Sequence, residues 1–223
     1  MDMQTGLFGR FMPERLSHGA YSIEIAAAQP MAVKKTDREN VIDGALALFR
    51  VKGYHHTSMS DISAACGLLK GSVYHYFPGK KELAVAALDR VIEDGRAKLF
   101  NPAHDPANGL DGNGGRTPKE RLQALADAVE RYFIGREGGC VMGNLALEVG
   151  GSVPEFVTRI RTYFEDWAKA LTKLLATKYG EARARELAED AIARAQGAIM
   201  IMGLTGDEEI LRRAGRDIVA LLD

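Results

Sequence analysis

Apolar residues recur at intervals of three and four positions along most of this 223-residue chain. Between positions 154 and 180, for example, Val157, Ile160, Phe164 and Trp167 follow one another at this spacing. Such spacing places apolar side chains on one face of an α-helix, whereas a half-buried strand alternates apolar and polar residues. No segment shows convincing alternation, and we therefore expect an all-α protein.

Capping residues, glycines and prolines divide this pattern into separate helices. Thr36 and Glu39 have the spacing of a capping box, and Ser58 with Asp61 predicts a second helix start. Pro118 suits the first turn of a later helix. The expected helices cover 37–52, 59–66, 70–77, 80–99, 118–134, 140–149, 154–179, 181–202 and 208–222. Residues 101–118 are rich in Gly, Pro, Asn and Asp, which predicts a surface loop.

Two short helices expected between 58 and 77, separated by Gly67, have the size of a helix-turn-helix unit. Their shared core is predicted to contain Ile62, Ala65, Leu68, Val73 and Phe77. The polar and aromatic residues of the second helix are left for its opposite side, from which they can reach phosphates and base edges in a major groove of DNA. Charge agrees with this interpretation. Residues 34–81 contain eight basic and four acidic side chains, a net +4, although the whole chain carries −1.

The segment from Thr36 to Leu88 resembles the DNA-binding domain of the TetR family of transcriptional regulators. The matching residues are Ala45, Phe49, Lys52-Gly53-Tyr54, Thr57-Ser58, Asp61-Ile62, Cys66-Gly67-Leu68, Lys70-Gly71-Ser72-Val73-Tyr74, Tyr76-Phe77 and Lys80-Lys81-Glu82-Leu83. The resemblance implies phosphate contacts by Tyr74, Tyr76 and Lys80. It places Lys70, Gly71, Ser72 and His75 nearest the bases, and Ser58 and Ser60 at the DNA backbone.

The resemblance also implies the domain organisation and the function. We expect a helix-turn-helix DNA-binding domain over 35–95, with its motif at 58–77, and a C-terminal ligand-binding and dimerisation bundle over 96–223. Such a protein is a cytoplasmic repressor more often than an activator. It binds a palindromic operator on double-stranded DNA as a homodimer, which pairs through the last two helices, and a small-molecule effector releases it. Two-fold symmetry places the two reading helices about 34–36 Å apart.

Two residues of the expected DNA-binding domain are unfavourable for the helices in which they lie. Family members often carry Ser or Thr immediately before the lysine of the recognition helix, where the side chain caps that helix. This chain has Leu69, which cannot cap, and the loss is worth about 1 kcal/mol. Gly44 lies inside the first expected helix, where alanine is expected to be more stable by about 1 kcal/mol.

The segment from Gly139 to Glu148 resembles a TetR subgroup with a Gly-Cys, Asn and Glu signature, some of whose members respond to electrophiles or short unsaturated acyl compounds. Cys140 opens a helix here, and the helix dipole can lower a thiol pKa at that position. The alternative is that Cys140 is a small buried apolar residue. The ligand-binding candidates are Tyr132, Cys140, Asn144, Glu148, Tyr163, Phe164 and Trp167. Helical spacing makes most of them core residues by default.

Several other functions are disfavoured. No histidine follows His104, which removes histidine-based catalysis and metal binding from the C-terminal part, so we expect no enzyme and no cofactor. A cysteine or carboxylate mechanism, and DNA binding without a ligand, remain as alternatives. No metal site is expected, because His55, His56 and His75 lack a recurring Cys/His spacing.

The remaining expectations concern location and the N-terminus. Two distant cysteines are no disulfide framework, which suits the cytoplasm. No apolar run is long enough to span a membrane. Residues 1–30 lack helical periodicity, and we expect either a disordered extension or a start codon assigned too early.

Overall fold

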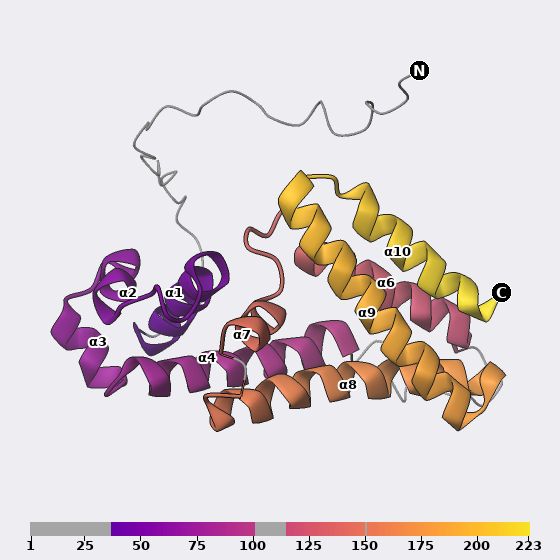
Figure 1. Cartoon of the computed structure of the whole chain (residues 1–223), viewed down its shortest axis with the longest axis horizontal. Helices are drawn as coiled ribbons and strands as arrows, with labels where there is room; N and C mark the ends of the chain where they lie inside the picture. The colour runs from indigo at the N-terminus through magenta and orange to yellow at the C-terminus, as the bar shows by residue number, and fades with distance from the viewer. Residues whose placement is uncertain (1–36, 101–114, 150) are drawn as a thin grey trace, which may run out of the picture. The chain divides into compact units, whose positions relative to one another are not determined.

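The computed structural model describes residues 37–100, 115–149 and 151–223 (Figure 1). Every regular element within these ranges is helical, which confirms the all-α prediction. The N-terminal segment 1–30, Thr36 of the expected capping box and most of the expected loop, residues 101–114, lie outside the described residues. No helix in the described ranges is long and apolar enough to cross a bilayer.

The structure has an N-terminal head and a C-terminal body, and each follows the expected order of helices (Figure 1). The head consists of α1 (Asp37–Lys52), α2 (Met59–Cys66), α3 (Lys70–Tyr76) and α4 (Lys80–Gly95), which a π-helical turn, η1 (Arg96–Phe100), continues. The body consists of α6 (Pro118–Phe133), α7 (Val141–Val149), α8 (Pro154–Tyr179), α9 (Glu181–Thr205), α10 (Glu209–Val219) and the 3₁₀ turn η3 (Ala220–Leu222).

Local capping explains where several of these helices begin. Ser58 and Asp61 form the predicted capping box of α2, and a left-handed Gly67 ends that helix at φ 65°. Thr117 and Glu120 form a second capping box, ahead of Pro118 in the first turn of α6. By contrast, no side chain caps α3 at Leu69, as predicted. These short-range hydrogen bonds fix helix ends without help from the rest of the fold.

The head has the predicted core with one exception. Ile62, Val73 and Phe77 are buried, and Leu68 is half-buried against them, whereas Ala65 is exposed. The prediction for Ala65 was wrong because the next residue, Cys66, makes the contact with α1. A β-carbon on Gly44 would lie only 2.5 Å from the Cys66 sulfur, so α1 and α2 approach each other too closely for alanine there. The expected gain from alanine at position 44 is therefore also wrong.

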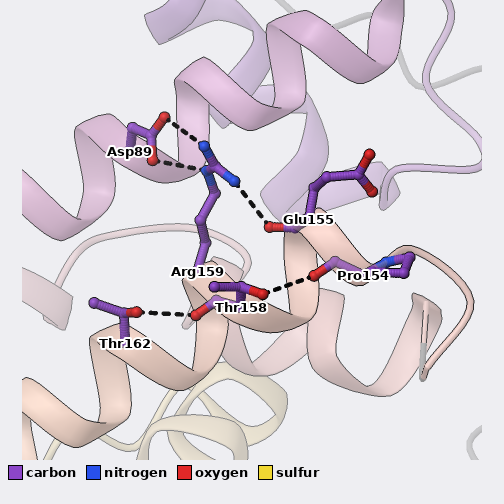
Figure 2. A network of polar contacts seen from close by, with 6 residues as sticks. All are labelled: Asp89, Pro154, Glu155, Thr158, Arg159 and Thr162. Carbon is purple, nitrogen blue, oxygen red and sulfur yellow. Dashed lines mark hydrogen bonds and ion pairs between the residues drawn. The ribbon is translucent and has the colours of Figure 1, made fainter.

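The body packs around α8 and α9, which lie against each other, while α6 and α10 complete its core. Helix α4 runs along α8 and joins the head to the body (Figure 1). Polar contacts secure this joint, as Figure 2 shows. Arg159 of α8 donates two hydrogen bonds to Asp89 of α4, at 2.7 and 3.1 Å, and a third to the carbonyl of Glu155 at 3.1 Å. The Lys81 ammonium lies 2.5 Å from a carboxylate oxygen of Glu155.

Candidate DNA-binding surface and ligand groove

The predicted DNA-contacting residues gather on one side of the head. Lys70, Gly71, Tyr74 and His75 are exposed on α3, while Val73 faces the core. A shallow hollow of about 460 Å³ brings five of the predicted residues together. They are Ser58, Ser60, Lys70, Tyr74 and Lys80. Ser72 and Tyr76 lie half-buried beside this surface.

Two histidines extend the same surface. His55 and His56 are exposed and line the hollow with Lys70 and Tyr74. We did not predict them as DNA contacts, because they precede the helix-turn-helix motif and carry no spacing signal. The side chains of Lys70 and Tyr74 form no hydrogen bond with another residue that the structure describes, and the Lys70 ammonium lies 5.9 Å from the Tyr74 ring centroid. These side chains are therefore available to a ligand with many acceptors, such as a phosphate backbone.

The Lys80 side chain lines the same hollow and also contacts the turn after α1. Its ammonium donates to the Tyr54 carbonyl at 2.8 Å and lies 4.3 Å from the centre of the Tyr54 ring. The His55 carbonyl lies 3.5 Å from the same atom. Lys80 thus stabilises the turn between α1 and α2, and its phosphate contact stays a prediction.

Helix α7 contacts the end of α1 through two polar side chains. One carboxylate oxygen of Glu148 accepts the backbone N–H of Tyr54 at 2.7 Å, and the other accepts that of His55 at 2.6 Å. The Asn144 side-chain amide donates to the Arg50 carbonyl at 3.2 Å and to the Gly138 carbonyl at 2.7 Å. Residues from the ligand-binding prediction therefore serve as a second joint between body and head.

A half-open groove of about 540 Å³ lies between α7 and α9, with Phe164 of α8 in its wall. Three of the predicted ligand-binding residues line it: Cys140, Asn144 and Phe164. Tyr163 and Trp167 are instead buried in the core, where both rings pack against Phe100 at centroid distances of 5.6 and 6.2 Å. Tyr132 and Glu148 do not line the groove either. The wall is mainly apolar, which is usual for small-molecule sites.

The Cys140 thiol does not have the lowered pKa that its place at a helix start suggested. Burial raises the pKa of this thiol, and the backbone amides of Gly143 and Met142 and the Gln196 side chain oppose that effect only in part. Cys140 is 6% exposed. The helix dipole was outweighed because the sulfur is shut away from water.

Gln196 is a polar groove residue that was not predicted from the sequence. It lines the groove on α9, and its side-chain nitrogen is buried near the Cys140 thiol, without a hydrogen bond of normal geometry to any described residue. In the sequence, Gln196 stands among alanines and looks like a solvent-exposed position of an Ala-rich helix. Only the three-dimensional structure shows that this donor is buried at the groove.

A helix-turn-helix head joined to a helical body defines a DNA-binding transcriptional regulator rather than an enzyme. Residues 41–87 match the bacterial regulatory proteins of the tetR family, and residues 118–217 match the C-terminal domain of LmrA/YxaF-like transcriptional regulators. The HTH-type transcriptional regulator LmrA of Bacillus subtilis is 29% identical over 171 residues, which cover 74% of this chain and 85% of that protein.

Solved structures of TetR transcriptional regulators are similar to this chain as well. A TetR transcriptional regulator from Chloroflexus aurantiacus is 31% identical, with a TM-score of 0.67 over 83% of this chain and 93% of that one. A second, from Legionella pneumophila, is 25% identical, with a TM-score of 0.73 over 84% and 97% of the two chains. The chain belongs to the TetR family of transcriptional regulators. Regulators of this family bind DNA, act as dimers and bind small-molecule effectors in their C-terminal domain.

Proposed function

We propose that this protein is a repressor that binds a palindromic operator as a homodimer and is released by a small-molecule effector. The observation that carries this proposal is the exposed side of α3, where Lys70, Tyr74 and His75 stand next to Ser58 and Ser60. Basic, hydroxyl and ring N–H groups on a short exposed helix suit contacts to phosphates and base edges in a major groove.

An apolar face on α9 and α7 supports the dimer. Leu147 is 86% exposed, Met200 59% and Leu204 80%, and all three also line the groove. Exposed apolar residues grouped in this way mark an interaction surface. The exposed side chains of α10 are mostly charged, among them Arg213 and Asp217. We expected the last two helices to form the interface, and we now propose that α9 with α7 supplies its apolar part.

The second subunit would then cover the rim of the groove. Cys140, Asn144, Phe164 and Gln196 are left as the inner wall, which makes the groove the proposed effector site. Helix α7 also holds the turn after α1 through Glu148, so a displacement of α7 by the effector reaches the head directly. The effector shifts the protein away from DNA only if it binds the non-operator arrangement more tightly.

Fluorescence anisotropy with the DNA upstream of the protein's own gene tests this proposal. Lys70→Ala should weaken operator binding and relax the sequence preference, since Lys70 is predicted to lie nearest the bases. Lys173→Ala is the matched control, because Lys173 is an exposed lysine of α8, outside the predicted DNA surface. No preference for any duplex, or equal effects of the two substitutions, would contradict the proposal. If no small molecule weakens operator binding, the protein binds DNA but has no effector.

A further inference from the structure

Two arginine side chains lie at the contact between head and body without an acidic partner among the described residues. Arg50, near the end of α1, is half-buried, and its Nε atom is buried with no hydrogen-bond partner. Arg136 lies in the connection between α6 and α7. Its guanidinium carbon is 4.1 Å from the centroid of the Tyr132 ring, and its Nε donates to the Tyr132 carbonyl at 2.8 Å. Neither arginine forms an ion pair with a residue in the described ranges.

The backbone around these arginines is tightly packed. Gly138 has a φ of 77°, and a β-carbon there would lie 2.6 Å from the Arg50 carbonyl oxygen and 2.7 Å from its Cγ. The Asn144 side-chain amide donates hydrogen bonds to the carbonyls of both Arg50 and Gly138. The connection after α6 therefore lies directly on Arg50, and only glycine fits at that point. This packing fixes where the Arg50 side chain begins.

Two nearby carboxylates are already engaged. Asp94, which lies within electrostatic range of Tyr132, binds Lys98 at 2.8 Å and Arg90 at 3.6 Å. Both oxygens of Glu148 accept backbone amides. Burial, and next the charge of the nearby Arg136, lower the pKa of Arg50. A half-buried cation beside a second cation is unfavourable unless an anion joins them.

We propose that Arg50 and Arg136 form an oxyanion site, and that the effector carries a carboxylate or phosphate group that binds there. The guanidinium fork matches the geometry of both groups and can bind either with two parallel hydrogen bonds. Tyr132 is half-buried beside Arg136. Gly138 and Asn144, which contact Arg50, also line the apolar groove between α7 and α9, where the rest of the ligand would lie. The anion would link α1 to the α6–α7 connection. Its role in releasing DNA rests on the proposed function.

Isothermal titration calorimetry of the full chain tests the site with matched probes. Benzoate and octanoate supply the carboxylate, benzamide and octanamide are their uncharged counterparts, and inorganic phosphate distinguishes the two sources of oxyanion. We expect at least one of the anions to bind saturably, and each amide to bind at least tenfold more weakly than its carboxylate or not at all. Phosphate binding alone would assign the site to phosphate groups.

Arg136→Gln is the deciding variant, because Arg136 is exposed and the fold does not depend on its burial. It should weaken binding of the anion about tenfold or more, as expected for a lost charge-assisted hydrogen bond. Arg131→Gln, on the exposed side of α6, is the matched control and should bind as the unmodified protein does. Arg50→Met should also weaken binding, with its helix content checked by circular dichroism.

The inference is overturned if the amides bind as well as the carboxylates, if Arg136→Gln changes nothing, or if no anion binds. Operator anisotropy on the same samples is a separate measurement. Loss of operator preference in the unmodified protein would contradict the proposed function, whereas the anion titration alone decides the oxyanion site.

Discussion

Replacing Glu148 with alanine should loosen the joint between α7 and the head. The carboxylate of Glu148 accepts the backbone amides of Tyr54 and His55 at 2.7 and 2.6 Å, across 94 and 93 positions of sequence. A β-carbon on Gly53 would lie 2.7 Å from the same carboxylate, so the turn after α1 is shaped around it. Alanine leaves both amides without this acceptor and opens a gap against Gly53.

The size of the effect follows from the exposure of the two amides. A hydrogen bond to a charged group contributes about 1.5–3 kcal/mol when the remaining partner stays buried. Tyr54 is half-buried, so the loss of its hydrogen bond costs most of this free energy. His55 is exposed, and its amide can bind water instead. We expect Glu148→Ala to lower the free energy of unfolding by about 2–3 kcal/mol. For a chain of this length, that lowers the melting temperature by about 4–12 °C.

Urea unfolding followed by circular dichroism measures this change. Glu148→Gln keeps one acceptor oxygen and should lose about half as much. Glu137→Ala is the matched control, because Glu137 is an exposed glutamate close to α7 with no ion pair among the described residues, and it should stay within about 0.5 kcal/mol of the unmodified protein. A Glu148→Ala protein as stable as this control would refute the role given to the joint.

Three further predictions use single side chains. Leu69→Ser should add the missing cap of α3 and raise the free energy of unfolding by about 1 kcal/mol, measured by thermal unfolding, and no gain would show that the α3 start cannot use a cap. Leu204→Glu should convert the dimer to a monomer, as measured by light scattering. Leu69→Glu changes an equally exposed leucine and should leave the dimer intact. A dimeric Leu204→Glu protein would place the interface elsewhere. Burial raises the pKa of the Cys140 thiol above its ordinary value, so little thiolate exists at pH 7.5, and iodoacetamide should alkylate Cys140 only after unfolding. Rapid alkylation of the native protein would instead support a reactive thiol.

The sequence was a good guide wherever a local signal determines structure. Ser58 and Asp61 cap their own helix, and Thr117 with Pro118 begins another, because the interacting groups are three residues apart. The apolar spacing likewise predicted most helices to within a few residues. The exposed side of α3 followed from the same logic, since Val73 and Phe77 define the buried side and leave the other side exposed.

Contacts between distant segments could not be predicted in this way. Nothing near Glu148 indicates that its carboxylate binds amides at the end of α1, so a ligand role was the reasonable hypothesis. Gly44 looked unfavourable because its partner, the Cys66 sulfur, belongs to another helix. The pKa of Cys140 was misjudged for the same reason, since burial depends on helices that follow it in the chain. The spacing of apolar residues shows which face of a helix is apolar, but it does not identify the segment that packs against that face.

The close packing of α2 and α3 on α1 restricts how this protein can respond to a signal. The Gly44–Cys66 approach shows that α1 and α2 pack closely at this point. If an effector displaces the head as one unit, as the proposed function implies, it changes the position of α3 and leaves the exposed surface of that helix intact. Recognition of an isolated half-site should survive induction, and only the match between the paired half-sites and the spacing of the two heads should be lost.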